Sequence, residues 1–363
     1  MPIERRRVTM PTVGTDQLET FVREIFVAAG TPPGPAADVA EHLVSANLVG
    51  HDSHGVNRAP GYIRLVETGH IVPDAPIEVY DETDTTAVVD ANWGLGFSAT
   101  NHATDLATAK AHAHGTGAVT IRRQSHMGRL GWYSARAAER GVISFVVADS
   151  GRAPKVVAPL GGRARRLGTN PLSFGVPSEL DGPLVLDMAT SAVAQGKTRI
   201  AKARGELLPY PCIVAADGSL TRDPHALGED DGGALLPFGG DQVHKGYGLS
   251  FMVEVFAGLL TGIGFSHDPG GFSNDGAFVA AFAVDRFRPL EEFTRDVRAF
   301  VDYLKDTPLA DGHDEILYPG EVEARTAARR RDQGIDIDDP TWQRLVDVAR
   351  RYAVEVPAAF DGH

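Results

Sequence analysis

The chain has 363 residues, 43% of them apolar, which is too long for one ordinary hydrophobic core and predicts a globular protein of two or three lobes. Its formal net charge of −13 disfavours a nucleic-acid partner, which requires clustered Lys and Arg. A single cysteine, Cys212, excludes an internal disulfide, and the sequence lacks both a leader-like segment and a run of 18 apolar residues, so we expect a cytoplasmic protein without membrane contact.

Residues 1–75 are predicted to form the N-terminal part of a helical domain. In residues 15–29, apolar side chains recur at the spacing of an amphipathic helix. A second helix begins near Pro35, a residue suited to a first helical turn, and ends at Gly50. A third, short helix follows after the octet HDSHGVNR, residues 51–58, which concentrates protonatable side chains.

Residues 76–284 are predicted to form an α/β domain. Strand-like runs such as TTAVVDA, GAVTIRR and VISFVVAD alternate with helices at 98–114 and 129–140. The run 246–262 is apolar nearly all round and predicts a buried helix. The pattern is helical again in residues 285–363, and we expect this part to pack on the first, so that the α/β domain is inserted in a discontinuous helical domain.

Two glycine motifs in the α/β part are similar to nucleotide-binding loops. Gly94, Gly96 and Ala99 follow a strand and open a helix, at the spacing of a dinucleotide fingerprint. The next strand ends in Arg122 and Arg123 instead of an acid, so the motif suits either the 2′-phosphate of NADP or a plain glycine turn. The segment SAVAQGKT lacks the first glycine of a phosphate loop, which argues against a phosphotransferase.

Local chemistry leaves several interpretations of the octet open. His51 and His54 stand three residues apart, but no HExxH or cysteine-rich spacing accompanies them, so we expect no metal site. Asp52, Ser53 and His54 include the members of a hydrolase triad, yet consecutive side chains point apart. A helix end remains the plainest interpretation, with a histidine favouring the helix dipole and Asp52 forming a turn.

Six segments, taken together, resemble the type-2 malate/L-lactate dehydrogenase family over residues 15–350: HDSHGVNRAPGYIRLVETGHI, RRQSHMGRLGWYSARAAERG, GTNPLSFGVP, LVLDMATSAVAQGK, PFGGDQVHKGYGLS and YPGEVE. That family comprises NAD(P)-dependent oxidoreductases of malate, lactate, sulfolactate, ureidoglycolate and diketogulonate, and reductases of cyclic imino acids such as piperideine-2-carboxylate. The resemblance implies a homodimer, NAD or NADP as cofactor, and a mixed-sheet cofactor domain whose fold is not a Rossmann fold. It therefore favours the glycine turn over the fingerprint at Gly94.

The resemblance also gives the octet chemical roles. His54 is the expected proton donor, because an imidazole titrates where acid–base catalysis is efficient. Arg58 is expected to grip the substrate carboxylate with its planar fork, and Ser53 and Tyr62 to contact the substrate through their hydroxyl groups. By resemblance to the imine reductases, Asp187 pairs with His54 and stabilises its protonated form.

His126 is the competing proton donor, since it corresponds to the acid–base histidine of ureidoglycolate-type members; His54 is preferred. Met127 stands where an aromatic residue is more usual, and YPGEVE lacks a histidine found in many members. Lys245 has a direct rationale as a cofactor residue, because its ammonium group can neutralise a pyrophosphate. The cofactor contacts implied by the resemblance are Ser125, Ser150, Thr169, Asn170, Met188, Ala189, Thr190, Ser191, His244, Lys245 and Glu321.

The main hypothesis is a dehydrogenase that transfers a hydride between the nicotinamide and a small 2-hydroxy or 2-oxo acid. Reduction of cyclic imino acids or N-alkyl imines is the alternative within the class, since the same histidine, aspartate and arginine serve a C=N bond. A catalytically silent nucleotide-binding protein is the alternative of another class, and it would bind the cofactor without turnover.

Overall fold

The computed structural model describes residues 10–149, 154–228, 232–265 and 275–358. The chain divides into two compact units, Met1–Asp74 with Gly320–His363, and Ala75–Pro319. The second change of unit thus falls at Gly320, not at residue 285 as the sequence analysis expected. Helix α8 (Leu290–Lys305) stays with the sheet-containing unit because Leu290 packs against Gly141 and Thr294 donates a hydrogen bond to Glu179.

The first unit is helical, as predicted. The predicted amphipathic helix is α1, which buries its apolar stripe, and α2 begins at Pro33. The Phe21 ring of α1 lies 5.7 Å from that of Trp342 in α10, which joins the two ends of the sequence in one core. The elements are β1 (Thr12–Val13), α1 (Thr15–Ala28), α2 (Pro33–Leu48), α3 (Ala59–Glu67), α9 (Glu321–Gln333), β12 (Ile335–Asp336) and α10 (Asp339–Arg351).

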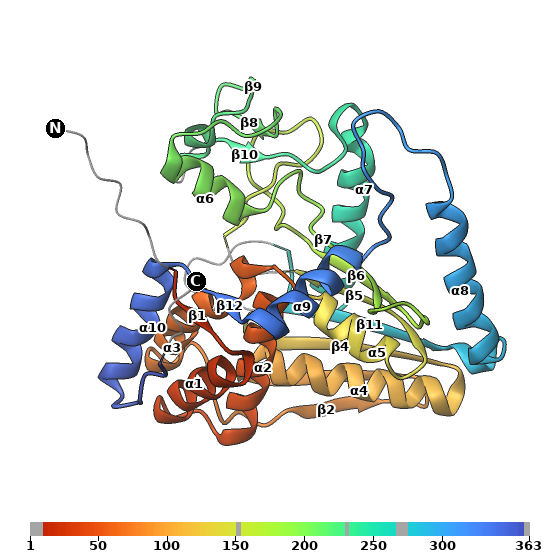
Figure 1. Cartoon of the computed structure of the whole chain (residues 1–363), viewed down its shortest axis with the longest axis horizontal. Coiled ribbons are helices and arrows are strands. Elements are labelled where there is room, and N and C mark those ends of the chain that lie inside the picture. Colours follow the sequence, from red (N-terminus) through yellow and green to blue (C-terminus); the bar gives the residue numbers. More distant parts are fainter. Residues whose placement is uncertain (1–9, 150–153, 229–231, 266–274, 359–363) are drawn as a thin grey trace. The chain divides into compact units, whose positions relative to one another are not determined.

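The second unit is built on a seven-stranded mixed sheet in the order β2-β3-β4-β11-β5-β6-β7 (Figure 1). Strands β3 and β4 run parallel, and the other neighbours in this sheet are antiparallel. The predicted alternation of strands and helices and the expected mixed sheet are both confirmed. The strands are β2 (Glu78–Glu82), β3 (Thr86–Gly94), β4 (Thr116–Gln124), β5 (Val142–Asp149), β6 (Leu172–Val176), β7 (Leu184–Met188) and β11 (Asp275–Ala283).

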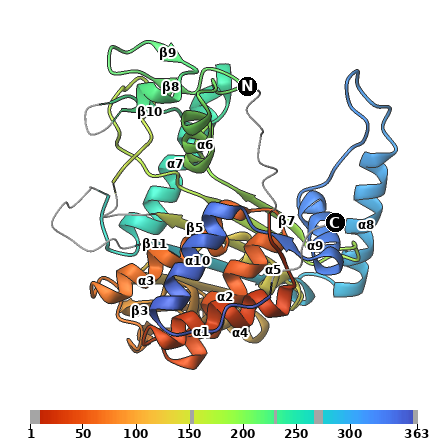
Figure 2. The same ribbon diagram turned by 60° about the vertical axis from the view of Figure 1, so that its left-hand side comes forward.

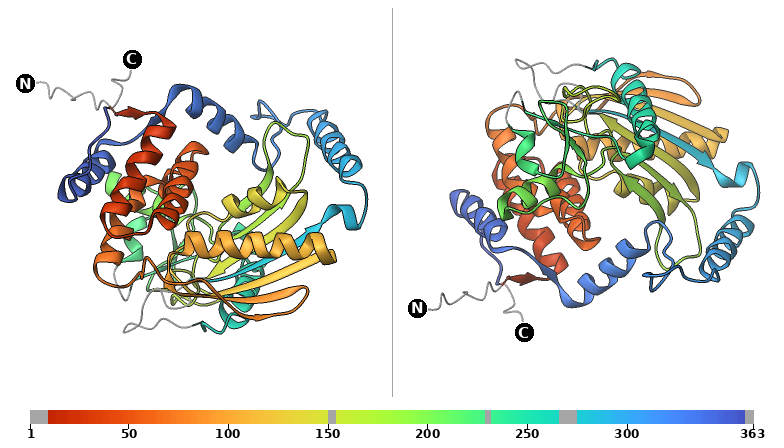
Figure 3. Two further views of the ribbon diagram at one scale, coloured as in Figure 1. Left: turned by 90° about the horizontal axis from the view of Figure 1, so that it is seen from below. Right: turned by 90° about the horizontal axis from the view of Figure 1, so that it is seen from above.

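Helices cover both faces of this sheet. On one face, α4 (Gly96–His114) and α5 (Gly131–Ala138) pack on small and branched side chains such as Val119, Ala277 and Val279. On the other face, α7 (Val243–Val253) continues into the π-helical segment η5 (Glu254–Leu259), which packs on Phe145 and Phe278. Figure 3 shows α4 lying along one face in its left panel and α7 on the opposite face in its right panel. Alternate residues of β5 and β11 therefore face two different cores.

A smaller three-stranded sheet, β8 (Ile213–Val214), β9 (Leu220–Thr221) and β10 (Ala234–Leu235), lies near α6 (Gln195–Arg204) and α7 (Figure 2). The fully buried helix expected over 246–262 is wrong in two respects. The α-helix gives way to the π-helical segment at Glu254, and one side of it is exposed at residues such as Phe251 and Met252. Within the described ranges, no helix has the length and hydropathy required to span a membrane.

Candidate active site

The octet HDSHGVNR folds as two short 3-10 turns, η1 (Asp52–His54) and η2 (Val56–Arg58). Gly55 between them is sterically required, because a Cβ there would lie 2.2 Å from Oδ1 of Asn47. The Asn47 side chain is buried, and its Oδ1 accepts the N–H of Val56 at 2.8 Å. The buried amide therefore fixes the backbone that joins the two turns.

His51 and Asp52 contact side chains of the same helical unit. Arg330 of α9 donates to both carboxylate oxygens of Asp52, at 2.7 and 3.2 Å, and Asn47 Nδ2 donates to it at 2.7 Å. His51 Nε2 lies 3.2 Å from Oε1 of Glu323, also on α9. These contacts give both residues a structural role at the end of α2.

The remaining side chains of the octet are suited to chemistry on a small acid. Ser53 Oγ lies 3.0 Å from His54 Nδ1, so a hydroxyl and an imidazole share a hydrogen bond. The Arg58 guanidinium lies 5.9 Å from the ring centroid of Tyr62, which is buried. One short stretch thus presents a titratable ring, a hydroxyl and a planar cation.

Ser125 and His126 follow β4 in the sheet-containing unit. Ser125 is buried, and its Oγ accepts the N–H of Gly96, the first residue of α4, at 3.0 Å. The Gly128 N–H donates to His126 Nδ1 at 3.1 Å. Because this nitrogen is an acceptor, the neutral His126 ring carries its proton on Nε2, where it is a hydrogen-bond donor.

Asp187 lies near the end of β7, and its Oδ2 accepts the N–H of Gly131 at 2.7 Å. A Cβ at Gly131 would lie 2.8 Å from the same oxygen and 2.6 Å from Nη1 of Arg129, so the approach depends on glycine. His126 lies in the short segment between β4 and α5, and Gly131 is the first residue of α5. The structure therefore groups Asp187 with His126 inside one unit.

Thr190 joins two of the segments expected to bind the cofactor. Its N–H donates to the Thr169 carbonyl at 2.9 Å, and its hydroxyl donates to the Asn170 carbonyl at 2.9 Å. Asn170 is 1% exposed and has a positive φ of 42°, a conformation that asparagine tolerates better than most residues. Its Oδ1 has no hydrogen-bond partner among the described residues.

Three further predicted residues flank Thr190. Met188 ends β7 and packs beside the apolar cluster under η5. Ala189 follows it and is partly buried. The Ser191 hydroxyl donates to the Val193 carbonyl at 2.9 Å, so it stabilises its own turn.

Helix α7 opens with His244 and Lys245, both exposed. Gly246 packs against Phe238, since a Cβ there would lie 2.2 Å from the Phe238 carbonyl oxygen. The Phe238 N–H in turn donates to the Thr190 carbonyl at 2.9 Å, which connects the start of α7 to the Thr190 turn. The first turn of α7 carries no acidic side chain, and the exposed ammonium group of Lys245 favours an anion there.

One predicted cofactor residue belongs to the helical unit, and another cannot be placed. Glu321 is the first residue of α9 in the helical unit; it is buried, and its carboxylate accepts a hydrogen bond from Arg325 at 2.6 Å. Ser150 lies outside the described residues.

The dinucleotide fingerprint is a packing motif. A Cβ at Gly96 would lie 2.1 Å from the carbonyl oxygen of Ser125, so the chain itself occupies the space that a pyrophosphate would need. Gly94 pairs with Gln124 across the β3–β4 ladder. The glycine turn implied by the family resemblance is confirmed.

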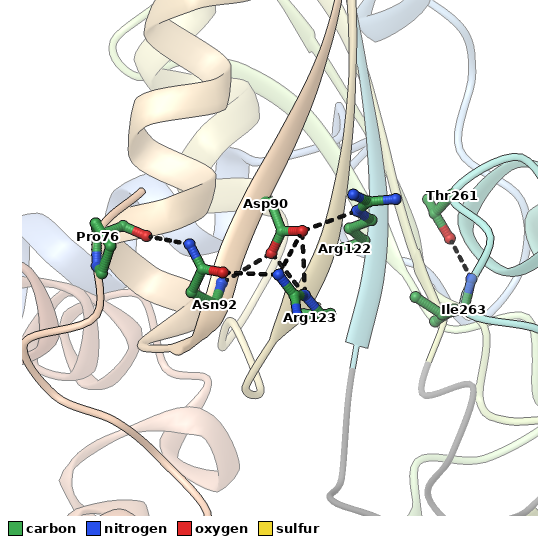
Figure 4. A network of polar contacts seen from close by, with 7 residues as sticks. All are labelled: Pro76, Asp90, Asn92, Arg122, Arg123, Thr261 and Ile263. Atoms are coloured by element: carbon green, nitrogen blue, oxygen red, sulfur yellow. Dashed lines mark hydrogen bonds and ion pairs between the residues drawn. The ribbon is translucent and has the colours of Figure 1, made fainter. Parts of the chain in front are cut away.

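Arg122 and Arg123 bind a buried carboxylate, Asp90 of β3 (Figure 4). Arg123 Nη2 donates to Asp90 at 2.8 Å and to Asn92 Oδ1 at 2.7 Å, and Arg122 Nε donates to Asp90 at 3.0 Å. Burial alone raises the pKa of Asp90, but the hydrogen bonds from Arg123, the Asn92 N–H and Arg122 outweigh burial and hold that pKa below its usual value. The arginines thus have a structural role, and this removes the observation on which an NADP preference rested.

The same unit holds a buried charged cluster that was not predicted from the sequence. Lys155 Nζ lies 3.2 Å from Asp149 Oδ1 and 3.2 Å from Glu254 Oε1, and all three side chains are at least 91% buried. Glu254 Oε2 accepts Asn170 Nδ2 at 2.9 Å. Burial raises the pKa of Asp149 to about 7, opposed by the nearby Lys155 ammonium. The one signal in the sequence was a lysine within a run of small and apolar residues, PKVVAP.

No trio of His, Cys, Asp and Glu side chains in the described parts of the chain is placed to hold a metal ion. The side-chain groups described above are an imidazole, carboxylates, hydroxyls and a guanidinium.

Known proteins match this chain over nearly its full length. The family model for malate/L-lactate dehydrogenase matches residues 13–346. An L-lactate dehydrogenase of Cupriavidus necator is 37% identical, over 93% of this chain and 97% of that enzyme. The crystal structure of malate dehydrogenase from Entamoeba histolytica superposes with a TM-score of 0.90 at 30% identity, over 96% of this chain and 100% of the other.

A third solved structure, of the delta1-piperideine-2-carboxylate reductase from Pseudomonas syringae, is similar with a TM-score of 0.80 at 34% identity, over 93% of this chain and 99% of the other. The shared fold is the mixed α/β architecture of the seven-stranded sheet. Because the family model covers most of the residues and relatives matched over nearly their full length exceed 30% identity, the chain belongs to the malate/L-lactate dehydrogenase family of NAD(P)-dependent enzymes and is a 2-hydroxy acid dehydrogenase acting on a CH–OH group.

Proposed function

We propose that the octet is the substrate-binding and proton-transfer segment of this dehydrogenase. The observation that carries the proposal is the hydrogen bond of 3.0 Å between Ser53 and His54, four residues before Arg58. A hydroxyl beside an imidazole and a guanidinium on the next turn provide the three groups that a 2-hydroxy acid requires: two partners for its hydroxyl and one for its carboxylate. Tyr62, which packs under Arg58, supports that guanidinium and adds a substrate contact.

His54 moves the proton in this proposal. During reduction the protonated ring donates a proton to the carbonyl oxygen, and during oxidation the neutral ring removes it from the hydroxyl. Asp187 is the supporting carboxylate, oriented by the Gly131 N–H. His126 remains the competing proton donor, because its neutral form presents a donor at Nε2 and because it shares a unit with Asp187.

The residues around Thr190 suit a dinucleotide. The start of α7 offers the Lys245 ammonium group and no first-turn acid, which favours a pyrophosphate. The buried Oδ1 of Asn170, without a partner among the described residues, is an acceptor suited to an amide N–H. Bound nicotinamide supplies or accepts the hydride. We therefore assign cofactor binding to the unit Ala75–Pro319, with Ser125, Thr169, Asn170, residues 188–191, His244 and Lys245 as its contacts, and extend the assignment to Ser150 and Glu321 on the family resemblance.

A second candidate reaction is reduction of a cyclic imino acid. The similarity to the piperideine-2-carboxylate reductase favours it, and the same proton donor and carboxylate grip serve a C=N bond. A guanidinium opposite the substrate carboxylate does not distinguish a carbonyl from an imine.

A homodimer is proposed as the working form. The α7 helix and its continuation expose large apolar side chains by 43% to 57%, more than a monomer normally leaves in water. They are Leu249, Phe251, Met252, Leu259 and Leu260. Sedimentation at micromolar concentration is expected to give twice the chain mass of 38.7 kDa, and a monomer would contradict the assignment. The buried free thiol of Cys212 suits a reducing compartment, so the cytoplasm is the proposed location.

The function is tested by following NADH and NADPH absorbance with malate-, lactate- and sulfolactate-type 2-oxo acids, and with a cyclic imino acid. We expect turnover with at least one 2-oxo acid. Turnover of the imine alone would favour the second candidate, and no turnover with any substrate would contradict both. Comparison of the two nucleotides decides between NAD and NADP.

A further inference from the structure

The buried cluster of Lys155, Asp149 and Glu254 has no place in the proton-transfer scheme above. The Lys155 ammonium lies 3.2 Å from each carboxylate, and the three side chains are 5%, 0% and 9% exposed. Each ion loses its water on folding, which costs several kcal/mol per ion in real proteins. Apolar residues of the same volume would serve stability as well or better, so the cluster calls for another explanation.

Glu254 of the cluster contacts Asn170, which lies in the turn assigned to cofactor binding. Glu254 contacts Lys155 through Oε1, and its other oxygen accepts Asn170 Nδ2 at 2.9 Å. The same amide nitrogen donates to the Ser250 carbonyl at 3.0 Å, so the Asn170 side chain is held from α7 and from its continuation. This hold fixes which way the amide points and leaves its Oδ1 turned away from Glu254.

The backbone at this turn needs such a hold. Asn170 has a φ of +42°, which costs free energy in a residue other than glycine. Thr190 bonds to the carbonyls of both Thr169 and Asn170. A change in the Asn170 side chain therefore shifts carbonyls that position the Thr190 turn.

Glu254 also begins the π-helical segment, a rare widening of a helix that is frequent at functional sites. Gly258 in that segment lies close to Asp149, since a Cβ there would be 3.2 Å from Asp149 Oδ2. The π-helical turn thus brings Glu254 and Asp149 to the same ammonium group.

We propose that Lys155 is a positioning residue for the nicotinamide cofactor: its ammonium group holds Glu254 in place, and Glu254 holds the Asn170 amide in the orientation that the cofactor meets. The inference rests on the proposed assignment of Thr169 and Asn170 to cofactor binding. Lys155 itself contacts carboxylates of the chain and acts through them.

The test compares Lys155→Met and Lys155→Arg with the wild type by equilibrium titration with NADH and NADPH, read from the fluorescence of the bound nucleotide. Lys155→Met keeps the length of the side chain and removes the charge. We expect its Kd for the preferred nucleotide to rise by roughly tenfold or more, the scale of losing one charge-assisted hydrogen bond. Lys155→Arg retains the cation and is expected to keep the Kd within about threefold, because a guanidinium serves the same two carboxylates.

Lys110→Met is the matched control. Lys110 is also a buried lysine, paired with Glu82 and with the Thr83 carbonyl, but it lies on α4 and has no contact with the Asn170 turn. We expect it to lower the melting temperature without changing the nucleotide Kd. The steady-state kinetics of Lys155→Met should show the same effect on binding. We expect its KM for the cofactor to rise, while its kcat at saturating cofactor stays within about threefold of the wild-type value.

If Lys155→Met does not fold, Glu254→Gln replaces it, since it keeps the shape and weakens the hold on the amide; we expect the same rise in Kd. If the wild type binds the nucleotide and Lys155→Met, or Glu254→Gln in its place, has the same Kd, this inference is overturned while the cofactor assignment stands. The inference would also be overturned if Lys155→Met and the control Lys110→Met lost nucleotide affinity to the same extent. Absence of nucleotide binding by the wild type would overturn the cofactor assignment and this inference with it.

Discussion

The carboxylate of Asp187 accepts the backbone N–H of Gly131 at 2.7 Å, at the point where α5 begins. This bond fixes the carboxylate with a main-chain group that side-chain motion does not disturb, and the helix N-terminus favours its negative charge. A methyl group at position 131 would enter the same space, within 2.8 Å of the carboxylate and 2.6 Å of Arg129.

Gly131→Ala is therefore expected to displace the carboxylate and lower kcat on the order of 10²-fold, the cost of about 1 Å of misplacement in an active site. Circular dichroism and the melting temperature should change little, because alanine favours the helix. Gly61→Ala in α3 is the control: it is a helical glycine with open space around it, and it should leave kcat unchanged. Wild-type kcat in Gly131→Ala would count against a catalytic Asp187.

The two histidines can be separated by paired substitution. General acid catalysis contributes about 10² to 10⁴-fold, so His54→Ala should lower kcat by that factor while the Kd for NADH or NADPH stays close to the wild-type value. His126→Ala should have the smaller effect on kcat. The reverse order would make His126, which shares a unit with Asp187, the proton donor.

Secondary structure was largely predictable where the signal is local. The apolar period of α1 and the proline at the start of α2 gave helices close to the observed bounds. The π-helical turn at Glu254 was not predictable, because an apolar run fits an α-helix equally well and the exposed side depends on what covers it.

Contacts between residues far apart in the sequence were also not predictable. Lys155 reads as an ordinary loop lysine, since its partner Glu254 lies 99 positions away. Arg122 and Arg123 read as free cations for a phosphate, because the sequence does not reveal that Asp90 is buried between them. The Gly96 motif likewise matched a phosphate loop until the carbonyl of Ser125 was found in its space.

The grip on the substrate carboxylate depends on the shape of a guanidinium. Arg58 lies over the ring of the buried Tyr62, which restricts its orientation. Arg58→Lys should mainly raise KM for the acid substrate, by about tenfold, because a point charge replaces a two-pronged donor and loses the ring contact. Steady-state kinetics at fixed cofactor concentration measures this. Arg64→Lys, at an exposed position of α3, the helix that carries Tyr62, is the control and should leave KM unchanged.

The stability of the chain should fall with rising pH through the ionisation of Asp149. Burial, opposed by Lys155, raises its pKa to about 7 in the folded chain, above the ordinary value of 3.8 that applies when unfolded. Between these values the folded state holds a proton that the unfolded state has lost, so this contribution is fully present below about pH 4 and is lost as pH rises through 7.

Asp149→Asn cannot ionise and should escape this loss. We expect the free energy of unfolding of the wild type, relative to the variant, to fall by on the order of 2 kcal/mol between pH 5 and 8, measured by urea denaturation. Asp90→Asn is the control, because the pKa of Asp90 is lowered: its contribution is lost only at acid pH, so that variant should differ from the wild type by a constant amount over the same range. A difference between wild type and Asp149→Asn that stays constant from pH 5 to 8 would mean that Asp149 is already ionised throughout, with Lys155 outweighing burial.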